Sequence, residues 1–560
     1  MWRKLILVFI LFSTLLFLSC GRNAKNGTDN VFRYNEMGDV TSLDPAEARN
    51  FENLWVDNQL YNGLIQTGDS FSIKPCIAKS WEISADGLTY TFHLRNDVFF
   101  QDNDVFTNGK GRKVTAHDFV FTFNRLLDPR VSDATSLLEK VDTNYPSILQ
   151  LKINSTSYIT LHGFSAPNDS TFEIHLKTPF APFLHILLMK YFSVVPEEAV
   201  KKYGMDFGEN PVGTGPFRLI KWEHGNAMVL KRNPNYFEKD AAGNNLPYLN
   251  GVIISFLKDE ETSFLEFMDG KFDLVSGINA INPSVAFTPD GQLRKEFTDR
   301  VCIQRTPFIK TDYLGFILDS KSLNSQLTIH NSQLIRRAIN YAINREEIVR
   351  YLRYNTGIPA ENGFIPPFLP GHGKVKGYRY DPDKALDLLK LAGYPNGKGL
   401  PDISLFVSSQ DYMLAETIQA QLQNIGIKLK VETEQPAILA EGVANGQCYF
   451  FKKSWIGDYP DGENFLSLFY SKNFSPGGIN YSHYANATFD SLYTLAISET
   501  NDSARAIEYT RMDSMIMDAA PVVPLYYDEV IRLVNKRITG LPLDPLNSLD
   551  LRFVKKKSGK

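Results

Sequence analysis

The chain has 560 residues, which is too long for a single hydrophobic core and predicts three or four structural units of about 150 residues each. Hydrophobic residues make up 43% and charged residues 22%, the proportions of a folded globular protein rather than of a disordered one. The net charge of −4 at pH 7 disfavours a nucleic-acid partner, which needs clustered basic surface.

The N-terminus has the pattern of an export signal. Arg3 and Lys4 precede the apolar run LILVFILFSTLLFL, which is shorter than the roughly 20 residues that span a membrane, and Cys20 follows a serine. This resembles a bacterial lipoprotein signal, in which residues 1–19 are removed and Cys20 is lipidated; an uncleaved signal anchor is the alternative. We expect residues 20–28 to be a polar tether and the mature chain to lie outside the cytoplasm, in the cell envelope, held to the membrane by its lipid.

Three further cysteines, Cys76, Cys302 and Cys448, are widely spaced and odd in number. Export permits disulfides, but the spacing does not show whether any pair forms. Small buried thiols are the simpler interpretation for Cys302 and Cys448, which both lie in strand-like segments.

Strand and turn patterns dominate the first half of the chain. Alternating residues flank Asp86-Gly87 and predict a β-hairpin. A helix is expected after Thr115, an N-cap residue, and four more strands are expected in TFEIHL, AMVLKR, GVIISFL and KFDLV.

Helices and strands alternate more regularly in the second half. The segment QLIRRAINYAINREEIVRYL (333–352) is predicted to be helical throughout. Pro382 and Gly393 fit the start and end of a second helix, and Gly426 ends a third before the strand IKLKVET. The chain has no tandem repeat and no low-complexity linker, so we expect an α/β protein whose lobes are connected by several chain crossings.

Catalytic and metal-binding signatures are absent from the sequence. The nine histidines are scattered, and no HExxH, GxSxG or Walker motif occurs. We therefore expect no enzyme activity, no metal and no cofactor. The segment NPVGTGPFRLIKW (210–222) is interpreted as a structural turn leading into a strand, in preference to a direct ligand contact.

Several segments taken together, in chain order, resemble one family. These are AKSWEISADGLTYTFHLRNDVFF, VTAHDFVFTFNRLLDP, NPVGTGPFRLIKW, RNPNYF and RRAINYAINREEIV. They are similar to the family 5 extracellular solute-binding proteins of ABC transporters, the oligopeptide- and dipeptide-binding type, and the similarity runs from about residue 31 to residue 551.

The resemblance implies a periplasmic-binding-protein-like fold in which two lobes close on the ligand, with an additional third domain. We expect lobe I at 29–56, 186–308 and 529–557, the extra domain at 57–185, and lobe II at 309–528. The crossings between lobes are expected near TPFIKTDYL and VPLYYDEV.

In peptide-binding members the ligand lies extended between the lobes and pairs with protein backbone, and an Asp in a W-x-x-D motif holds its amino group. That motif is Trp455-Ile456-Gly457-Asp458 here, so the resemblance implies that Asp458 is the amine partner. The expected ligand-binding residues are Val40, Ser454, Trp455, Ile456, Gly457 and Asp458. Asp461 and Glu463 are expected to belong to the turn that follows.

The partner for a ligand carboxylate is open. Lys452 and Lys453 precede the motif and are the candidate positive charges, with exposed strand positions as the alternative. The predicted function is a monomeric, lipid-anchored binding protein that captures short peptides and delivers them to an ABC permease. Nickel-chelate, haem or oligosaccharide binding on the same fold is the first alternative, and a secreted hydrolase using Asp458 and Glu463 as paired carboxylates is the second.

Overall fold

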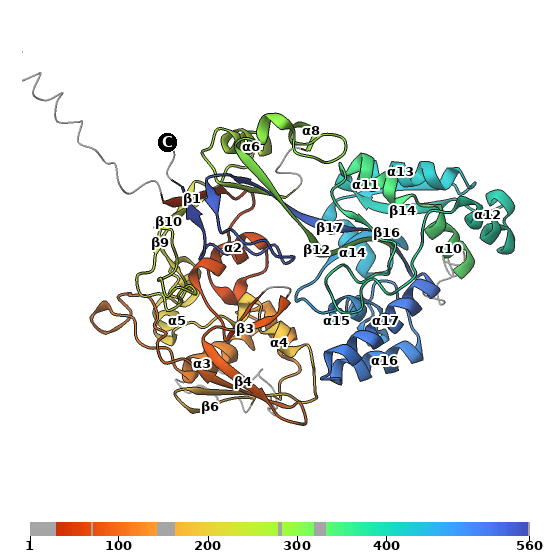
Figure 1. Cartoon of the computed structure of the whole chain (residues 1–560). Helices are drawn as coiled ribbons and strands as arrows, with labels where there is room; N and C mark the ends of the chain where they lie inside the picture. Colours follow the sequence, from red (N-terminus) through yellow and green to blue (C-terminus); the bar gives the residue numbers. More distant parts are fainter. Residues whose placement is uncertain (1–29, 69–70, 143–162, 278–282, 319–331, 558–560) are drawn as a thin grey trace, which may run out of the picture.

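The computed structural model describes residues 30–68, 71–142, 163–277, 283–318 and 332–557. Cys20 and the predicted signal and tether lie outside these residues. Two large bodies face each other, one built mainly from the first half of the chain and the other from the second half (Figure 1). None of the described helices has the length and apolar character to cross a membrane.

A mixed sheet of 11 strands runs through both bodies, in the order β15-β14-β16-β12-β17-β11-β1-β10-β9-β8, with β13 paired to β17. Its strands are β1 (Val31–Asn35), β8 (Phe217–Glu223), β9 (Ala227–Arg232), β10 (Gly251–Ser255), β11 (Leu274–Ser276), β12 (Val301–Phe316), β13 (Ile358–Pro359), β14 (Ile403–Ser408), β15 (Leu429–Glu434), β16 (Phe450–Ile456) and β17 (Val522–Asn535).

The two long strands β12 and β17 connect the bodies. They are antiparallel neighbours, and their pairing shifts register between Pro307 and Thr311 and again after Asp312. On one side of these shifts β17 pairs with β11, and on the other β12 pairs with β16. The shifts fall within the two segments predicted as crossings, so the lobes are joined where the ladder is locally irregular.

A separate sheet of four strands, in the order β4-β5-β7-β6, lies within the predicted extra domain. The expected hairpin is present between β4 and β5, with Gly87 at φ +71°, a conformation that favours glycine. Thr115 and Asp118 form a capping box at the start of α3 (Ala116–Leu126), as the N-cap pattern predicted. The strands of this region are β2 (Ile65–Thr67), β3 (Ile73–Pro75), β4 (Ala78–Ile83), β5 (Thr89–Leu94), β6 (Phe164–Asn168) and β7 (Thr171–His175).

Helices cover the sheets. Those of the first body are α2 (Phe51–Leu60), α3 (Ala116–Leu126), α4 (Phe183–Ile186), α5 (Glu197–Tyr203), α6 (Glu260–Met268) and α8 (Pro283–Ala286). Those of the second are α10 (Gln333–Ala342), α11 (Arg345–Leu352), α12 (Pro382–Leu391), α13 (Tyr412–Gln423), α14 (Pro436–Ala444), α15 (Glu463–Leu466), α16 (Ala487–Ser498) and α17 (Asp502–Ala519). Two short strands, β18 (Ile538–Thr539) and β19 (Lys555–Lys556), pair near the C-terminus.

The prediction of one helix over 333–352 was wrong in one respect, because the segment forms two helices. Asn344 separates α10 from α11, and its side chain accepts a hydrogen bond from the backbone amide of Glu347 at the start of α11. The apolar periodicity continues across the break, but an N-cap residue at that point ends one helix and begins another.

Residues of the predicted lobe I and extra domain share one hydrophobic core, and lobe II has its own. Two side chains pack in the core of the opposite body. Phe71 of the extra domain packs in the core of lobe II, and Tyr459 of lobe II packs in the core of lobe I. The backbone amide of Ala181 also donates to the carbonyl of Ile497 at 2.7 Å. The two bodies are therefore in direct contact in this structure.

Candidate binding site

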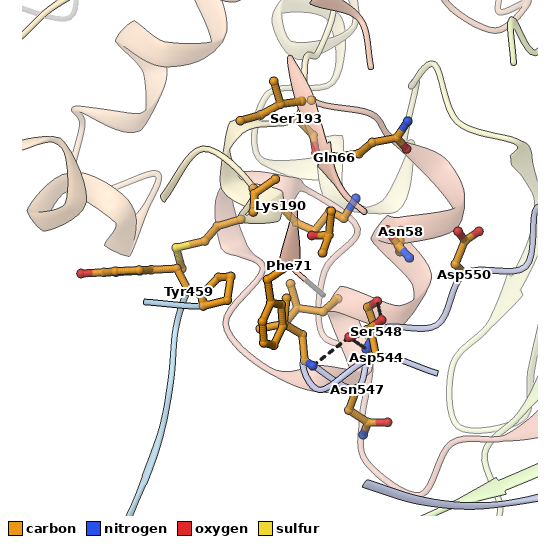
Figure 2. A pocket seen from close by; sticks show the side chains of 18 of the residues that line it. Asn58, Gln66, Phe71, Lys190, Ser193, Tyr459, Asp544, Asn547, Ser548 and Asp550 are labelled. Carbon is orange, nitrogen blue, oxygen red and sulfur yellow. Dashed lines mark hydrogen bonds between the residues drawn. The ribbon is translucent and has the colours of Figure 1, made fainter. Parts of the chain in front are cut away.

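A cavity of about 940 Å³ lies between the two bodies. This is near the upper end of the usual range for small-molecule sites, about 300–1,000 Å³. Its walls come from segments far apart in the sequence, namely residues within 48–76, 185–193, 456–460 and 542–553. The lining residues labelled in Figure 2 include Tyr459 of lobe II, Asn58 of the extra domain, and Ser548 and Asp550 of lobe I.

The lobe II wall is the end of β16 and the loop after it. Ile456, Gly457 and Asp458 line the cavity. The amide of Gly457 donates to the carbonyl of Ile309 at 2.8 Å, directly beyond the pair of Lys310 and Ile456 that ends the β12–β16 ladder. Because hydrogen-bonded and non-hydrogen-bonded positions alternate along antiparallel strands, the backbone groups of Ile456 and Ser454 point away from β12.

The other edge of β16 is open beyond its first residues. β14 pairs with β16 only at Phe451, and in the described part of the chain no further strand continues that side. An unpaired strand edge is a template for an added strand. The edge that carries Ser454 and Ile456 can therefore accept an extended peptide backbone, and its end at Ile456 opens into the cavity.

Asp458 follows this edge and has one side-chain partner. The Nδ2 of Asn464 donates to its Oδ2 at 3.4 Å, and its own backbone amide donates to Oδ1 of Asn464 at 3.2 Å. The same Oδ1 accepts the indole N–H of Trp455 at 2.9 Å. Asn464 thus fixes the loop and the tryptophan together, which places Trp455 behind the wall rather than on its surface.

The electrostatic position of Asp458 is unusual. Its side chain is open to the cavity, yet the surrounding protein excludes enough water to raise the pKa of the carboxyl, and the hydrogen bond from Asn464 only partly offsets this. Among the described residues, no lysine, arginine or histidine lies within 4 Å of it. A carboxylate that faces a cavity without a counter-charge could pair with a cation there.

The two later acids of the same segment are already engaged. Glu463 is buried and accepts hydrogen bonds from the hydroxyls of Tyr459 and Tyr493. Asp461 accepts the backbone amide of Glu463 at 2.9 Å, the turn geometry that the sequence predicted, and lies 3.8 Å from His185 and 3.6 Å from Arg505. Asp458 and Glu463 therefore contact different partners, which gives no support to a pair of catalytic carboxylates.

Neither lysine proposed as a carboxylate partner lines the cavity. The ammonium of Lys452 is 2.7 Å from Asp312 and 3.2 Å from Asp411, and these carboxylates raise its pKa against the opposing effect of burial. Lys453 lies over the ring of Tyr481, 4.3 Å from its centroid. Lys452 belongs to an internal ion-pair cluster and Lys453 to a half-buried aromatic contact, so the structure brings neither to the cavity.

Val40 also stays outside the lining. It is 6% exposed and packs in the core of lobe I, while the next residue, Thr41, donates its amide to Oδ1 of Asn53. Of the predicted ligand-binding residues, the structure gathers Ile456, Gly457 and Asp458 at the cavity, whereas Val40, Ser454 and Trp455 are not part of its lining.

The cavity wall opposite lobe II was missed by sequence reasoning. It contains aromatic side chains: Phe51 and Phe308 pack with ring centroids 6.0 Å apart, and Phe71 of the extra domain is also in the lining. Phe308 lies within a predicted crossing segment, which is the one signal that could have found it. The polar part includes Lys190, which begins a short 3-10 helix (Lys190–Phe192), and Arg552.

The segment 210–222 is structural, as interpreted from the sequence. A Cβ atom on Gly213 would lie 2.0 Å from the carbonyl oxygen of Leu60, and one on Gly215 would lie 2.3 Å from its carbonyl carbon. The glycines let this turn pack against the end of α2. The hydroxyl of Thr214 donates to the side-chain oxygen of Asn62 at 3.1 Å. Asn62 lines the cavity, so the turn supports a cavity residue without lining the cavity itself.

Metal and disulfide chemistry gain no support. The described residues hold no cluster of three or more His, Cys, Asp or Glu side chains suited to a metal ion. Cys76, Cys302 and Cys448 are free thiols, and burial raises the pKa of Cys76 to about 12. No disulfide joins any two of these three cysteines in this structure.

Comparison with known proteins gives a consistent family assignment. The model described as "Bacterial extracellular solute-binding proteins, family 5 Middle" matches residues 72–477. Heme-binding protein A of Haemophilus influenzae is 29% identical over 542 residues, covering 93% of this chain and 91% of that protein. The dipeptide-binding protein of Escherichia coli is 27% identical over 508 residues, covering 87% of each.

Solved structures agree in fold. The periplasmic binding protein DppA from Helicobacter pylori, in complex with the peptide STSA, superposes with a TM-score of 0.69 at 26% identity, covering 94% of this chain and 98% of that one. HbpA2 from Haemophilus parasuis gives a TM-score of 0.76 at 23% identity, covering 94% and 100%. Both comparisons extend over nearly the whole length of each chain.

Proposed function

The chain belongs to the family 5 bacterial extracellular solute-binding proteins, and from this premise we propose that it captures short peptides between its lobes and delivers them to an ABC permease. Family membership makes it an extracytoplasmic binding protein rather than an enzyme. Lipid anchoring through Cys20, a monomeric state and the identity of the ligand as a peptide are parts of the proposal.

The observation that carries the peptide proposal is Asp458. It is a carboxylate that opens into the cavity, has no cationic partner among the described residues, and directly follows a strand edge with unpaired backbone groups. A peptide offers both complements at once: a positive amino group and a row of backbone N–H and C=O groups beside it.

The expected energetic contribution of this contact is modest and measurable. A hydrogen bond to a charged group adds about 1.5–3 kcal/mol net. That corresponds to about 10–150-fold in affinity. Most of the remaining affinity would come from backbone pairing along β16 and from the aromatic wall, neither of which selects a particular side chain.

Haem is the alternative that the relatives raise, since one of them is named a heme-binding protein. The rings of Phe51, Phe71 and Phe308 would suit a flat apolar ligand. A dianionic porphyrin would leave Asp458 facing the cavity without a cation, so the charge arrangement favours a ligand with an amino group.

The test compares a free-amine peptide with its N-acetylated form by calorimetry, in wild type and in Asp458→Asn. We expect the wild type to prefer the free amine by about 10–150-fold and the variant to lose that preference. Asp402→Asn, an exposed carboxylate of lobe II outside the cavity, is the matched control and should retain it. Equal affinity of the wild type for both peptides would remove the amine-pairing role.

A further inference from the structure

Lys190 is a second charged group in the cavity that lacks a counter-ion. Lys190 lines the cavity together with Cys76 and Arg552, and Figure 2 shows its side chain among those of the lining. Among the described residues no carboxylate lies within 4 Å of its ammonium, and no side-chain hydrogen bond is formed by it.

Two carboxyl groups lie near Lys190 without reaching ion-pair distance. Asp57 is fully buried, and this burial raises its pKa well above the usual value, which favours the neutral acid. Asp550 is committed to an arginine. Arg552 forms ion pairs with Glu238 and with Asp550, the latter at 2.7 Å, and it donates to Oε1 of Gln66 at 2.5 Å. Asp550 is close enough to act on Lys190 electrostatically, yet beyond ion-pair distance. The cavity end that contains Lys190 therefore keeps one positive charge unmatched.

The position of Lys190 is fixed by the backbone around it. Its carbonyl accepts the amide of Ser193 at 3.0 Å, and the amide of Val194 donates to the carbonyl of Asn62 at 3.0 Å. The first bond closes the short helix, and the second ties Val194 to the segment that follows α2. Burial lowers the pKa of Lys190, as expected for an ammonium removed from water without a partner.

The two unmatched charges come from opposite lobes. Asp458 is in lobe II and Lys190 is in lobe I, and both line one cavity. A ligand with separated positive and negative ends can pair with both only when the lobes are together, so each charge contact would also favour closure. A ligand bearing a single charge would leave one of the two groups desolvated and unpaired.

We infer that Lys190 binds the carboxylate of a zwitterionic ligand whose amino end pairs with Asp458, and that it sets the preference for peptides with a free C-terminus. This inference rests on the proposed function. It replaces Lys452 and Lys453 with a lysine from the other lobe, and it makes charge separation across the cavity the basis of ligand choice.

The experiment uses tri-, tetra- and pentaalanine, each as the free acid and as the C-terminal amide, with calorimetry on wild type, Lys190→Met and Lys239→Met. Lys239 is an exposed lysine on the rim of the same cavity and is the matched control. We expect amidation to weaken wild-type binding of the best-bound peptide by about 10–100-fold, and the control to behave in the same way. In Lys190→Met the acid and the amide should bind within about threefold of each other.

Folding of the variant is checked separately by thermal unfolding. Removal of an unpaired, partly buried ammonium should leave the unfolding midpoint of Lys190→Met unchanged or higher. If wild type binds the acids but does not distinguish them from the amides, or if Lys190→Met still distinguishes them, the role of Lys190 is refuted while peptide capture stands. If wild type binds none of the peptides, the proposed function fails and this inference fails with it.

Discussion

Replacement of Asp312 by asparagine tests whether buried ion pairs hold the strands that cross between the lobes. Asp312 is 1% exposed and lies between the ammonium groups of Lys452, at 2.7 Å, and Lys310, at 3.2 Å. Lys310 also contacts Asp528, at 2.8 Å, on the neighbouring strand β17. The cluster thus joins β12, β16 and β17 at the register shifts between the two bodies.

The magnitude follows from the removed charge. Although burial opposes ionisation, the two lysines lower the pKa of Asp312 from 3.8 to about 2. A shift of this size corresponds to about 2 kcal/mol of stability at neutral pH. Asparagine would in addition leave two buried ammonium groups short of a partner, and the loss of one member of a buried pair costs about 3–5 kcal/mol.

The assay is urea unfolding of the chain from residue 21 onward, followed by circular dichroism. At pH 7 we expect the midpoint of Asp312→Asn to fall by about 1 M or more, for a slope of about 3 kcal/mol/M. The folded pKa of Asp312 is the depressed one, so its contribution is present above about pH 4 and is lost as the pH falls toward 2. The difference between wild type and variant should therefore narrow over that interval.

The control is Arg511→Met, which removes the exposed ion pair with Glu508 on α17. Exposed pairs contribute about 0–1 kcal/mol, so its midpoint should stay close to that of the wild type. If Asp312→Asn unfolds at the same urea concentration as Arg511→Met, the buried cluster is not a source of stability and the reasoning fails.

Three further predictions concern the site and its surroundings. Burial raises the pKa of Asp458, and a bound ligand amine would lower it. The affinity for a free-amine peptide should therefore fall, by up to tenfold per pH unit, as the pH decreases below the raised pKa of the free protein, and the affinity of Asp458→Asn should stay constant over the same range. A wild-type affinity that does not change with pH would contradict this. Gly213→Ala places a methyl group 2.0 Å from the carbonyl oxygen of Leu60 and should cost at least about 2 kcal/mol in thermal unfolding, whereas Gly477→Ala, whose Cβ meets nothing closer than 3.9 Å, should be nearly neutral. The three cysteines of the described residues should all react with a maleimide in denaturant without prior reduction, and a mass showing fewer than three adducts would reveal a disulfide.

The fold was predictable where local signals agree with packing. The hairpin at Gly87, the capping box at Thr115 and the strand β9 all lie where residue patterns placed them. The break at Asn344 was not anticipated, because an asparagine within an apolar helical pattern can lie inside a helix or cap a new one, and the sequence does not distinguish the two. The backbone conformation around the residue determines whether its side chain caps a helix.

Candidate residues could be named from the sequence on one side of the cavity. Asp458, which lines it, was named because it belongs to a motif that is continuous in the sequence. Lys452 was proposed and Lys190 was missed for one physical reason: the partner of a lysine is set by tertiary packing. Asp312, the ion-pair partner of Lys452, is 140 residues away from it in the sequence. Nothing in the local sequence of Lys190 shows that this lysine lies in a cavity without a counter-ion.

The central claim is that the ligand of this cavity is a short peptide. Native mass spectrometry of the protein isolated from its own organism, followed by release and sequencing of whatever is bound, tests it most directly. The account predicts bound species composed of amino-acid residues with a free amino end and a free carboxyl end, and their loss in Asp458→Asn. Recovery of haem, a sugar or a metal chelate in place of peptides would contradict it.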